Sequence, residues 1–306
     1  MKKEIKMKFE GIMPALLTPI NENSTLREDA ARMLCKYQLA EGADGVYVCG
    51  ATGEGVLLNA ETRKAMCEVV IDEVKGKIPV ITHVASIDTM ETIELAKHAE
   101  RMGADCVAAV PPFYFQYNEH EVYDYYKALA SAVSIPVMIY YFPASGAQMD
   151  ANLVAKLFEI DNITSIKWSS RDYFDVIQLK EMTHGEINII NGPDETLLCG
   201  LAAGADGGIG ANYNVALPLF KKLYAEFKAG NIEGARKAQN DIHKIRAAIR
   251  GTGTLIPALK YVLELRGIPF GEAAFPMQKL SEEQKAKLVS DLKKYPDIFS
   301  LDPIEF

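Results

Sequence analysis

Short hydrophobic runs alternate along this chain with longer stretches in which hydrophobic residues recur at helical spacing. The runs are rich in Val and Ile and are largely uninterrupted by polar residues, which is typical of parallel strands buried on both faces. Several of the amphipathic stretches end in glycine, the residue favoured just after a helix C-terminus. Eight runs precede residue 215, at 11–19, 45–50, 80–85, 106–112, 137–142, 163–169, 187–192 and 207–213.

Eight β-α units within about 230 residues predict an α/β fold, the closed (β/α)8 TIM barrel. An open doubly wound sheet is the alternative, but it usually has a glycine-rich fingerprint after its first strand. No such fingerprint is present here. After residue 230 the pattern is wholly helical. We therefore expect a barrel over residues 1–230 and a helical appendage over residues 231–306 that packs on the barrel or forms contacts between subunits.

Composition narrows the class of protein. The chain has 306 residues, of which 49% are hydrophobic and 24% charged, with a net charge of −8. No basic stripe indicates binding to nucleic acid or to an anionic membrane surface. No hydrophobic stretch is long enough to cross a bilayer, and the charged first ten residues lack the core of a secretory signal. The five cysteines are odd in number and widely spaced, which favours a cytoplasmic protein.

One lysine lies in a strand-like hydrophobic segment, "DNITSIKWSS" at residues 161–170. Alternation places Ser165 and Lys167 on the face opposite Ile166 and Trp168. An ammonium group buried there is costly unless it is paired, reaches water or loses its proton. A lysine that extends to the surface or pairs with a carboxylate is the ordinary explanation. The residues at the other strand ends decide between these alternatives.

In a (β/α)8 barrel the active site is built from the C-terminal ends of the strands and the loops that follow them. The sixth such end contributes Lys167, Ser169 and Ser170. No pair of histidines accompanies the few carboxylates at these ends, so we expect no metal ion there. The other ends contribute residues 49–55 ("CGATGEG"), 111–115 ("PPFYF"), 140–146 ("YYFPASG"), 191–195 ("NGPDE") and 207–214 ("GGIGANYN").

This hydroxyl- and glycine-rich rim around one lysine favours Schiff-base chemistry. A desolvated lysine has a lowered pKa, and its neutral amine can attack a ketone to form a covalent imine. A tyrosine could carry the proton, and Tyr114, Tyr140 and Tyr141 all lie at neighbouring strand ends. Backbone amides in the turn 51–54 could hold the carboxylate of a 2-oxo acid. Each piece alone could be structural, for example as a glycine turn or as packing of the rim.

Taken together, the segments resemble the dihydrodipicolinate synthase / N-acetylneuraminate lyase family of pyruvate-dependent class I aldolases. The resemblance extends from about residue 9 to about residue 295. As a set in this order the segments are specific, although each alone is weak. They are 50–54 ("GATGE"), 111–114 ("PPFY"), 140–143 ("YYFP"), 165–167 ("SIK") and 204–210 ("GADGGIG").

The resemblance implies roles for individual residues. Lys167 would form the Schiff base with pyruvate, and Tyr140 would relay the proton. Thr52, with the adjacent amides of Ala51 and Gly53, would grip the carboxylate. Tyr114 would reach the proton relay, in several members from a neighbouring subunit. The family also implies a homotetramer that uses no metal or cofactor.

Two branches of the family differ at the far end of the site. The synthase branch has an arginine two residues after the proline of Tyr-x-x-Pro, whereas here Pro143 is followed by Ala144, Ser145 and Gly146. The sialic acid lyase branch resembles "NGPDE" better. In that branch Gly192, Asp194 and Glu195 would match groups that bind the polyhydroxyl tail of the sugar. We expect Ser169, on the hydroxyl-rich rim, to bind substrate as well.

Three positions depart from the family pattern. Ala51 replaces the usual Ser or Thr, which removes a hydroxyl that bridges to Tyr140. Ala211 replaces the serine that sialic acid lyases place near the tail, and Tyr141 replaces an Asn or His. These departures bear on the sugar acid more than on the imine chemistry.

We therefore expect reversible cleavage of a 2-oxo-3-deoxy sugar acid to pyruvate and an aldehyde, with N-acetylneuraminate as the first choice of substrate. A 2-keto-3-deoxygluconate-type aldolase is the close alternative, and dihydrodipicolinate synthase is the next. A hypothesis from another class is a catalytically silent sensor of keto acids, which only Ala51 supports.

Overall fold

The structure is a computed structural model that describes residues 8–145 and 147–305. Its eight parallel strands form one sheet in the order β1-β8-β7-β6-β5-β4-β3-β2. An isolated parallel bridge between Ala15 and Tyr47 joins β1 to β2 and brings the two edges together. The expectation of a (β/α)8 barrel is confirmed. The strands are β1 (Gly11–Pro14), β2 (Val46–Val48), β3 (Val80–His83), β4 (Cys106–Ala109), β5 (Val137–Tyr141), β6 (Ile163–Trp168), β7 (Asn188–Asn191) and β8 (Gly207–Gly210).

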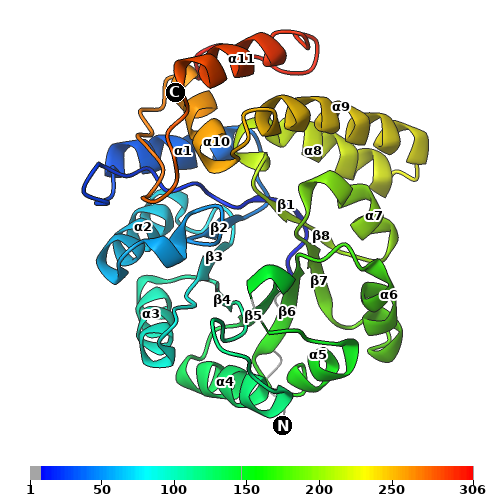
Figure 1. Ribbon diagram of the computed structural model, residues 1–306. Helices are drawn as coiled ribbons and strands as arrows, with labels where there is room; N and C mark the ends of the chain where they lie inside the picture. Colours follow the sequence, from blue (N-terminus) through cyan, green and yellow to red (C-terminus); the bar gives the residue numbers. More distant parts are fainter. Residues whose placement is uncertain (1–7, 146, 306) are drawn as a thin grey trace.

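A ring of helices surrounds the strands (Figure 1). Asn118 shows how local sequence starts one of them: its side chain accepts from the backbone N–H of Glu121, whose carboxylate accepts from the Asn118 N–H in turn. The ring consists of α1 (Glu28–Ala40), α2 (Ala60–Val74), α3 (Thr89–Met102), α4 (Glu119–Ala132), α5 (Ala151–Leu157), α6 (Tyr173–Met182), α7 (Leu197–Ala202) and α8 (Tyr213–Lys228).

All eight predicted strands are present, but each ends before its hydrophobic run does. The first run continues to residue 19, whereas β1 ends at Pro14, and the eighth continues to residue 213, whereas β8 ends at Gly210. Beyond β1 the chain is still buried, and the Leu17 N–H donates to the side chain of Asn214 at 3.1 Å. Burial therefore extends past the ladder, and hydrophobicity alone does not mark where strand pairing stops.

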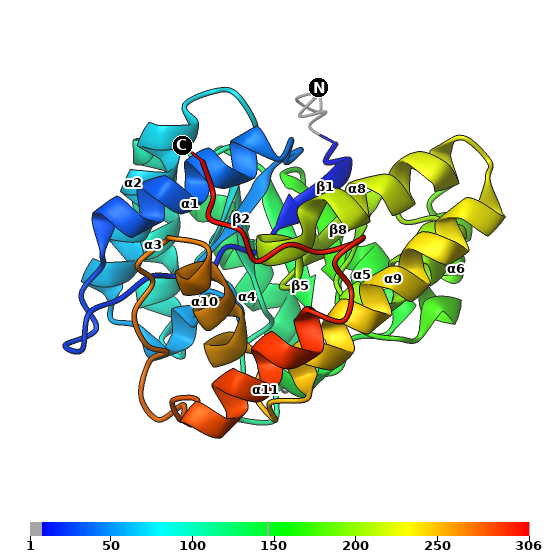
Figure 2. The same ribbon diagram turned by 90° about the horizontal axis from the view of Figure 1, so that it is seen from above.

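The C-terminal helices pack against one side of the barrel (Figures 1 and 2). They are α9 (Ile232–Arg250), α10 (Ile256–Leu265) and α11 (Glu282–Leu292). Their buried residues, such as Ile242 and Leu259, belong to the same hydrophobic cluster as Ile12 and Val46 of the barrel strands. The appendage and this side of the barrel thus share one core. The division into two parts at residue 230 stays a prediction.

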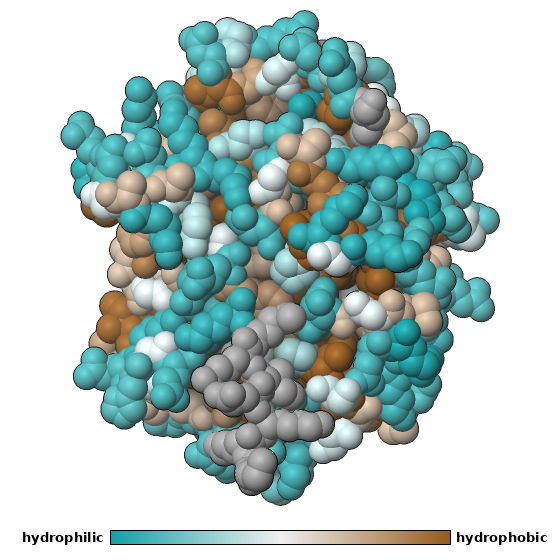
Figure 3. Space-filling model, turned by 180° about the vertical axis from the view of Figure 1, so that it is seen from behind, coloured by the Kyte–Doolittle hydropathy of each residue, from teal (hydrophilic) through white to brown (hydrophobic). Residues whose placement is uncertain are grey.

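The surface carries mainly polar groups on the face seen from behind, with smaller hydrophobic areas between them (Figure 3). Among the residues that the structure describes, none of the helices combines the length and hydrophobicity that crossing a membrane requires.

Candidate active site

Lys167 lies inside the barrel, one residue before the end of β6. Only 4% of its surface is exposed. Ile166 and Trp168, on either side of it, pack in the hydrophobic layer between the strands and helices. Within the described part of the chain, no carboxylate forms an ion pair with its Nζ, and Asp194 acts on it only through its charge. The sequence-based expectation of an inward-facing lysine agrees with this placement, and neither a surface position nor an ion pair explains it.

Aromatic rings surround the Lys167 amine. Its Nζ lies 4.3 Å from the ring centroid of Tyr47 and 4.2 Å from that of Tyr140. The ring of His83 packs edge-on against Tyr140, with 5.7 Å between centroids. Burial removes the amine from water and lowers the pKa of Lys167 to about 7, and the negative charge of Asp194 opposes only part of that change. A substantial fraction of this lysine is therefore neutral near neutral pH.

Tyr140 and Tyr141 point to opposite sides of β5. Tyr140 is the direct register partner of Lys167 on β6 and lines the cavity. Burial raises the pKa of Tyr140 to about 12, and a hydrogen bond with Ser169 offsets part of the rise. Tyr141 instead packs on Trp168 with 4.5 Å between ring centroids, and its hydroxyl donates to Gln148 at 3.4 Å. Of these two tyrosines, Tyr140 is therefore the one that lies beside the Lys167 amine.

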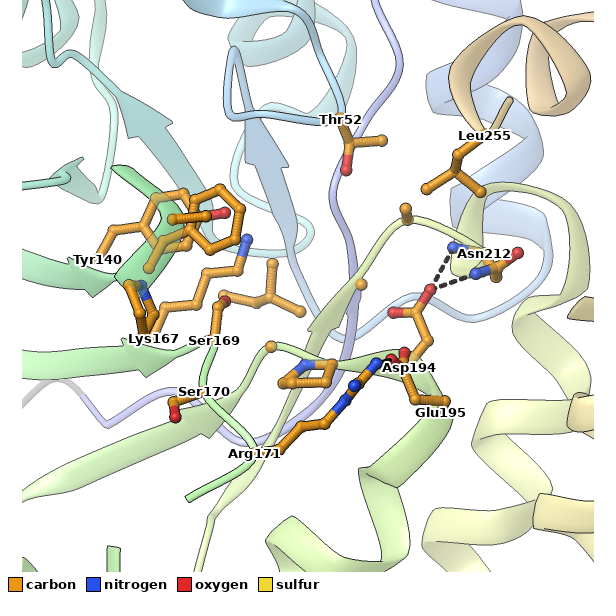
Figure 4. A pocket seen from close by; sticks show the side chains of 18 of the residues that line it. Thr52, Tyr140, Lys167, Ser169, Ser170, Arg171, Asp194, Glu195, Asn212 and Leu255 are labelled. Carbon is orange, nitrogen blue, oxygen red and sulfur yellow. Dashed lines mark hydrogen bonds and ion pairs between the residues drawn. The ribbon is translucent and has the colours of Figure 1, made fainter. Parts of the chain in front are cut away.

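A cavity of about 490 Å³ opens above Lys167 at the C-terminal end of the strands. In Figure 4, Lys167 lies on one side of it, Asp194 and Glu195 lie on the other, and Thr52 lies above and between them. The cavity is lined by Thr52, Tyr140, Phe142, Pro143, Ala144, Lys167, Ser169, Ser170, Arg171, Gly192, Pro193, Asp194, Glu195, Ile209, Gly210, Ala211, Asn212, Arg246, Arg250 and Leu255.

Two glycines make room for polar side chains in this cavity. A Cβ atom on Gly192 would lie 2.0 Å from the hydroxyl of Ser169, and one on Gly210 would lie 1.7 Å from Oδ1 of Asp194. Both distances are far below van der Waals contact. Glycine at these positions lets Ser169 and Asp194 occupy the wall of the cavity.

Asp194 is buried, and among the described residues only one of its two carboxylate oxygens has hydrogen-bond partners. Its Oδ2 accepts from the backbone N–H of Asn212 at 2.8 Å and from the Asn212 side chain at 2.5 Å. Its Oδ1 is buried without a hydrogen-bond partner among the described residues. Burial raises the pKa of Asp194, and the two bonds from Asn212 limit that rise. A ligand hydroxyl could satisfy the unpartnered oxygen.

Glu195 is held by two arginines. Its Oε1 pairs with Arg171 at 2.5 Å and with Arg246 at 3.1 Å. Burial would raise the pKa of Glu195, but the hydrogen bond from Arg171 and the charges of both arginines outweigh it and lower the pKa. Its backbone oxygen also lies 2.7 Å from Nε2 of His243.

Most of the predicted site residues line the cavity, and three do not. Ala51 is exposed outside the lining. Gly53 is buried beside the cavity, where its carbonyl accepts from the Thr18 hydroxyl at 2.7 Å. Tyr114 is 79% exposed, has a backbone φ of 82° and packs its ring on Phe115. The lining does include Lys167, Tyr140, Thr52, Ser169, Gly192, Asp194, Glu195 and Ala211.

Sequence reasoning missed five residues around this cavity: Tyr47, Arg171, Arg246, Arg250 and Leu255. Alternation within β2, between Val46 and Val48, was the signal that could have placed Tyr47 inside the barrel. Arg246, Arg250 and Leu255 come from the appendage. No motif in the sequence indicates that this part of the chain reaches the site.

In the ranges that the structure describes, no group of three or more His, Cys, Asp or Glu side chains is arranged to hold a metal ion. The expected absence of a metal or cofactor stays a prediction.

The chain is similar to known proteins over nearly its whole length. Residues 8–295 match the model of the dihydrodipicolinate synthetase family. An N-acetylneuraminate lyase of Rhizobium meliloti is 34% identical over 282 residues, which cover 92% of this chain and 94% of that protein.

Two solved structures are similar over nearly their full length. The Ruminococcus gnavus sialic acid aldolase has a TM-score of 0.92 and 30% identity, covering 95% of this chain and 98% of that one. The Clostridium difficile protein CdNal, solved in complex with mannosamine, has a TM-score of 0.91 and 29% identity, covering 94% and 100%.

Proposed function

The chain belongs to the dihydrodipicolinate synthetase family, and on that premise we propose that it cleaves N-acetylneuraminate to pyruvate and N-acetylmannosamine. It is a pyruvate-dependent class I aldolase, a carbon–carbon lyase. The observation that carries this assignment is the buried, unpaired Lys167 amine whose pKa is lowered to about 7. The sialic acid lyases among the similar proteins support the choice of sugar acid.

The reaction begins at the Lys167 amine. Its neutral form attacks the C2 ketone of the open-chain sugar acid, and the resulting carbinolamine loses water to give an iminium ion. Tyr140, which is protonated at neutral pH, donates the proton that leaves with this water. The iminium charge then lies close to the Tyr140 ring, where it stabilises the phenolate that remains.

Bond cleavage uses the same two groups. The Tyr140 phenolate accepts the proton of the C4 hydroxyl, the C3–C4 bond breaks, and its electron pair moves into the iminium to form an enamine. The aldehyde leaves with its new carbonyl at C4. Protonation of the enamine at C3 and hydrolysis of the imine then release pyruvate and regenerate Lys167.

The rest of the cavity binds the two ends of the substrate. The Thr52 hydroxyl lines the cavity and would hold the C1 carboxylate together with nearby backbone amides (Figure 4). On the side opposite Lys167, Asp194 and Glu195 would accept hydrogen bonds from the hydroxyls of the sugar. Gly192 and Ala211 would leave space for its chain.

Two neighbours of the site bear on the alternatives. Ala144 lines the cavity in the loop where the synthase branch has its arginine, so the carboxylate of a semialdehyde would lack its bidentate partner there. Gly146, in the same loop, lies outside the described residues. Ala51 offers no hydroxyl to Tyr140, whereas Ser169 forms a hydrogen bond with it.

The assembly is part of the proposal. Tyr114 stands on the surface in a backbone conformation that is unusual for a bulky residue, which supports a role outside its own subunit. We propose a cytoplasmic homotetramer acting in carbohydrate metabolism, in which Tyr114 reaches the proton relay of a neighbouring subunit.

A substrate panel tests the function. N-acetylneuraminate and 2-keto-3-deoxygluconate are assayed for release of pyruvate, and aspartate semialdehyde is assayed for condensation with pyruvate. We expect the highest kcat/KM with N-acetylneuraminate. A higher value for ketodeoxygluconate or for the semialdehyde would move the assignment to that branch. A pyruvate adduct at Lys167 without turnover of any member would favour the sensor.

A further inference from the structure

Helix α9 presents a polar stripe to the far side of the cavity. Gln239, His243, Arg246 and Arg250 follow one another at intervals of four, three and four residues, which places them on one face of the helix. Gln239 accepts from the Leu198 N–H at 3.1 Å, and the next two bind Glu195. Arg250 extends the stripe to the cavity, which it lines.

The positive charge at this end exceeds the negative charge that faces it. Arg171 and Arg246 share a single carboxylate oxygen of Glu195. The Oδ2 atom of Asp194 accepts instead from the backbone and the side chain of Asn212 (Figure 4). Arg250 is exposed, and its guanidinium group forms no ion pair or hydrogen bond with any described residue. Three guanidinium groups thus line the cavity together with two carboxylates, those of Asp194 and Glu195, in a chain whose net charge is −8.

We propose that, among sugar acids of the N-acetylneuraminate type, this cavity binds more tightly those whose aldehyde half ends in an anion, a phosphate ester or a carboxylate, which Arg250 binds together with Arg246. The proposal rests on the proposed aldolase function and specifies the substrate class of the same site. Guanidinium groups bind phosphate and carboxylate through paired N–H donors, and such charge-assisted bonds are stronger than those to hydroxyls. A neutral polyol tail would leave the Arg250 guanidinium without an anionic partner.

The placement of the two ends fits this preference. The keto carbon must lie at Lys167, on one side of the cavity, and Glu195 with its arginines lies on the other (Figure 4). An anion there would sit at the end of the substrate farthest from the bond that breaks. It would therefore change binding and positioning and leave the imine chemistry to Lys167.

Matched pairs of aldehydes test the proposal. Pyruvate is condensed with N-acetylmannosamine or its 6-phosphate, and with mannose or mannuronate, so that each pair differs only in the terminal anion. We expect kcat/KM to be about 10-fold or more higher for the anionic member of at least one pair. The phosphate pair and the carboxylate pair separate the two chemistries. Equal or better use of both neutral members would overturn the proposal.

Variants of arginines on α9 test whether the preference for anionic aldehydes depends on Arg250. Arg250→Gln should reduce the anionic-to-neutral ratio of kcat/KM by about 10-fold, and Arg250→Lys, which keeps the charge without the paired donors, should reduce it less. Arg236→Gln is the matched control, since it removes the same charge from α9 about 21 Å along the helix from Arg250. A ratio that falls as much in this control as in Arg250→Gln would contradict a role for Arg250.

Calorimetric binding to the Lys167→Ala variant separates this proposal from the aldolase assignment. Tighter binding of the anionic members, without a pyruvate adduct in the wild type, would support the anion site and overturn the lyase. An adduct in the wild type, with equal binding of the anionic and neutral members of each pair, would overturn the anion site and leave the aldolase assignment unchanged.

Discussion

Lys167 combines burial with the absence of a paired carboxylate, and this combination sets how the enzyme responds to pH. The pKa lowered to about 7 means that the neutral fraction of the amine rises as pH rises through that value. We predict that the initial rate of pyruvate adduct formation rises about 10-fold from pH 6 to pH 8 and then levels off. The measurement is stopped-flow trapping at constant ionic strength. A rate that keeps rising tenfold per pH unit above pH 8 would indicate an ordinary lysine.

Tyr140 and Tyr141 are adjacent in the chain. Substituting each one separately distinguishes a role in proton transfer from a role in packing. Tyr140→Phe should retain the pyruvate adduct but lower kcat by about 10²-fold or more, because the phenol that exchanges protons is removed. Tyr141→Phe is the control and should retain most of the activity, since its ring packs on Trp168 away from the cavity. The reverse pattern, measured as kcat with N-acetylneuraminate, would mean that the tyrosines have been assigned in the wrong order.

For individual residues, the sequence predicts which way a side chain points where strand alternation determines it. Lys167 is such a case, because one strand with a two-residue period fixes which face it occupies. Ala51 is not, since it lies in a loop whose direction depends on tertiary contacts. The sequence alone does not distinguish Ala51 from its neighbour Thr52, yet of the two only Thr52 lines the cavity.

The turn after β2 is connected to α10 by a buried ion pair. Glu54 and Lys260 contact each other with almost no exposure, Glu54 also accepts from the Ala274 N–H at 2.6 Å, and Lys260 donates to the Glu272 carbonyl at 3.0 Å. This pair fixes the loop that carries Thr52 against the C-terminal helices.

Breaking that pair should destabilise the protein. Lys260→Met leaves the Glu54 carboxylate buried without its cation, and we expect the free energy of unfolding in urea to fall by about 3–5 kcal/mol. The double variant Glu54→Gln, Lys260→Met removes both charges and should recover part of the loss. A single variant within about 0.5 kcal/mol of the wild type would show that the pair does not hold the turn.

Elements were predicted well where a buried run coincides with a paired strand, and less well at their ends. Leu17 is as buried as a strand residue, but it binds Asn214 instead of a neighbouring strand. The contribution of α9 to the site also escaped prediction. Its polar stripe has the same spacing as any solvent-exposed helix face, so only the folded arrangement shows that Arg246 and Arg250 face the cavity.

At the scale of the whole molecule, the barrel topology followed from the order of hydrophobic runs, whereas the assembly did not. We predict that the protein sediments as four chains and that Tyr114→Phe lowers kcat by about 10-fold or more while retaining that mass. Sedimentation velocity and a turnover assay on the same sample provide both readouts. A fully active monomer would remove Tyr114 from the mechanism.

The proposed aldolase function depends on a neutral Lys167 amine that condenses with a keto acid inside the mouth of the barrel. The most direct measurement is reduction by borohydride in the presence of pyruvate, followed by peptide mass spectrometry, with Lys167→Ala alongside. We predict one reduced pyruvate per chain, located on the peptide that contains Lys167, and no adduct in the variant. An unmodified wild-type protein, or an equal adduct on another lysine, would contradict the account.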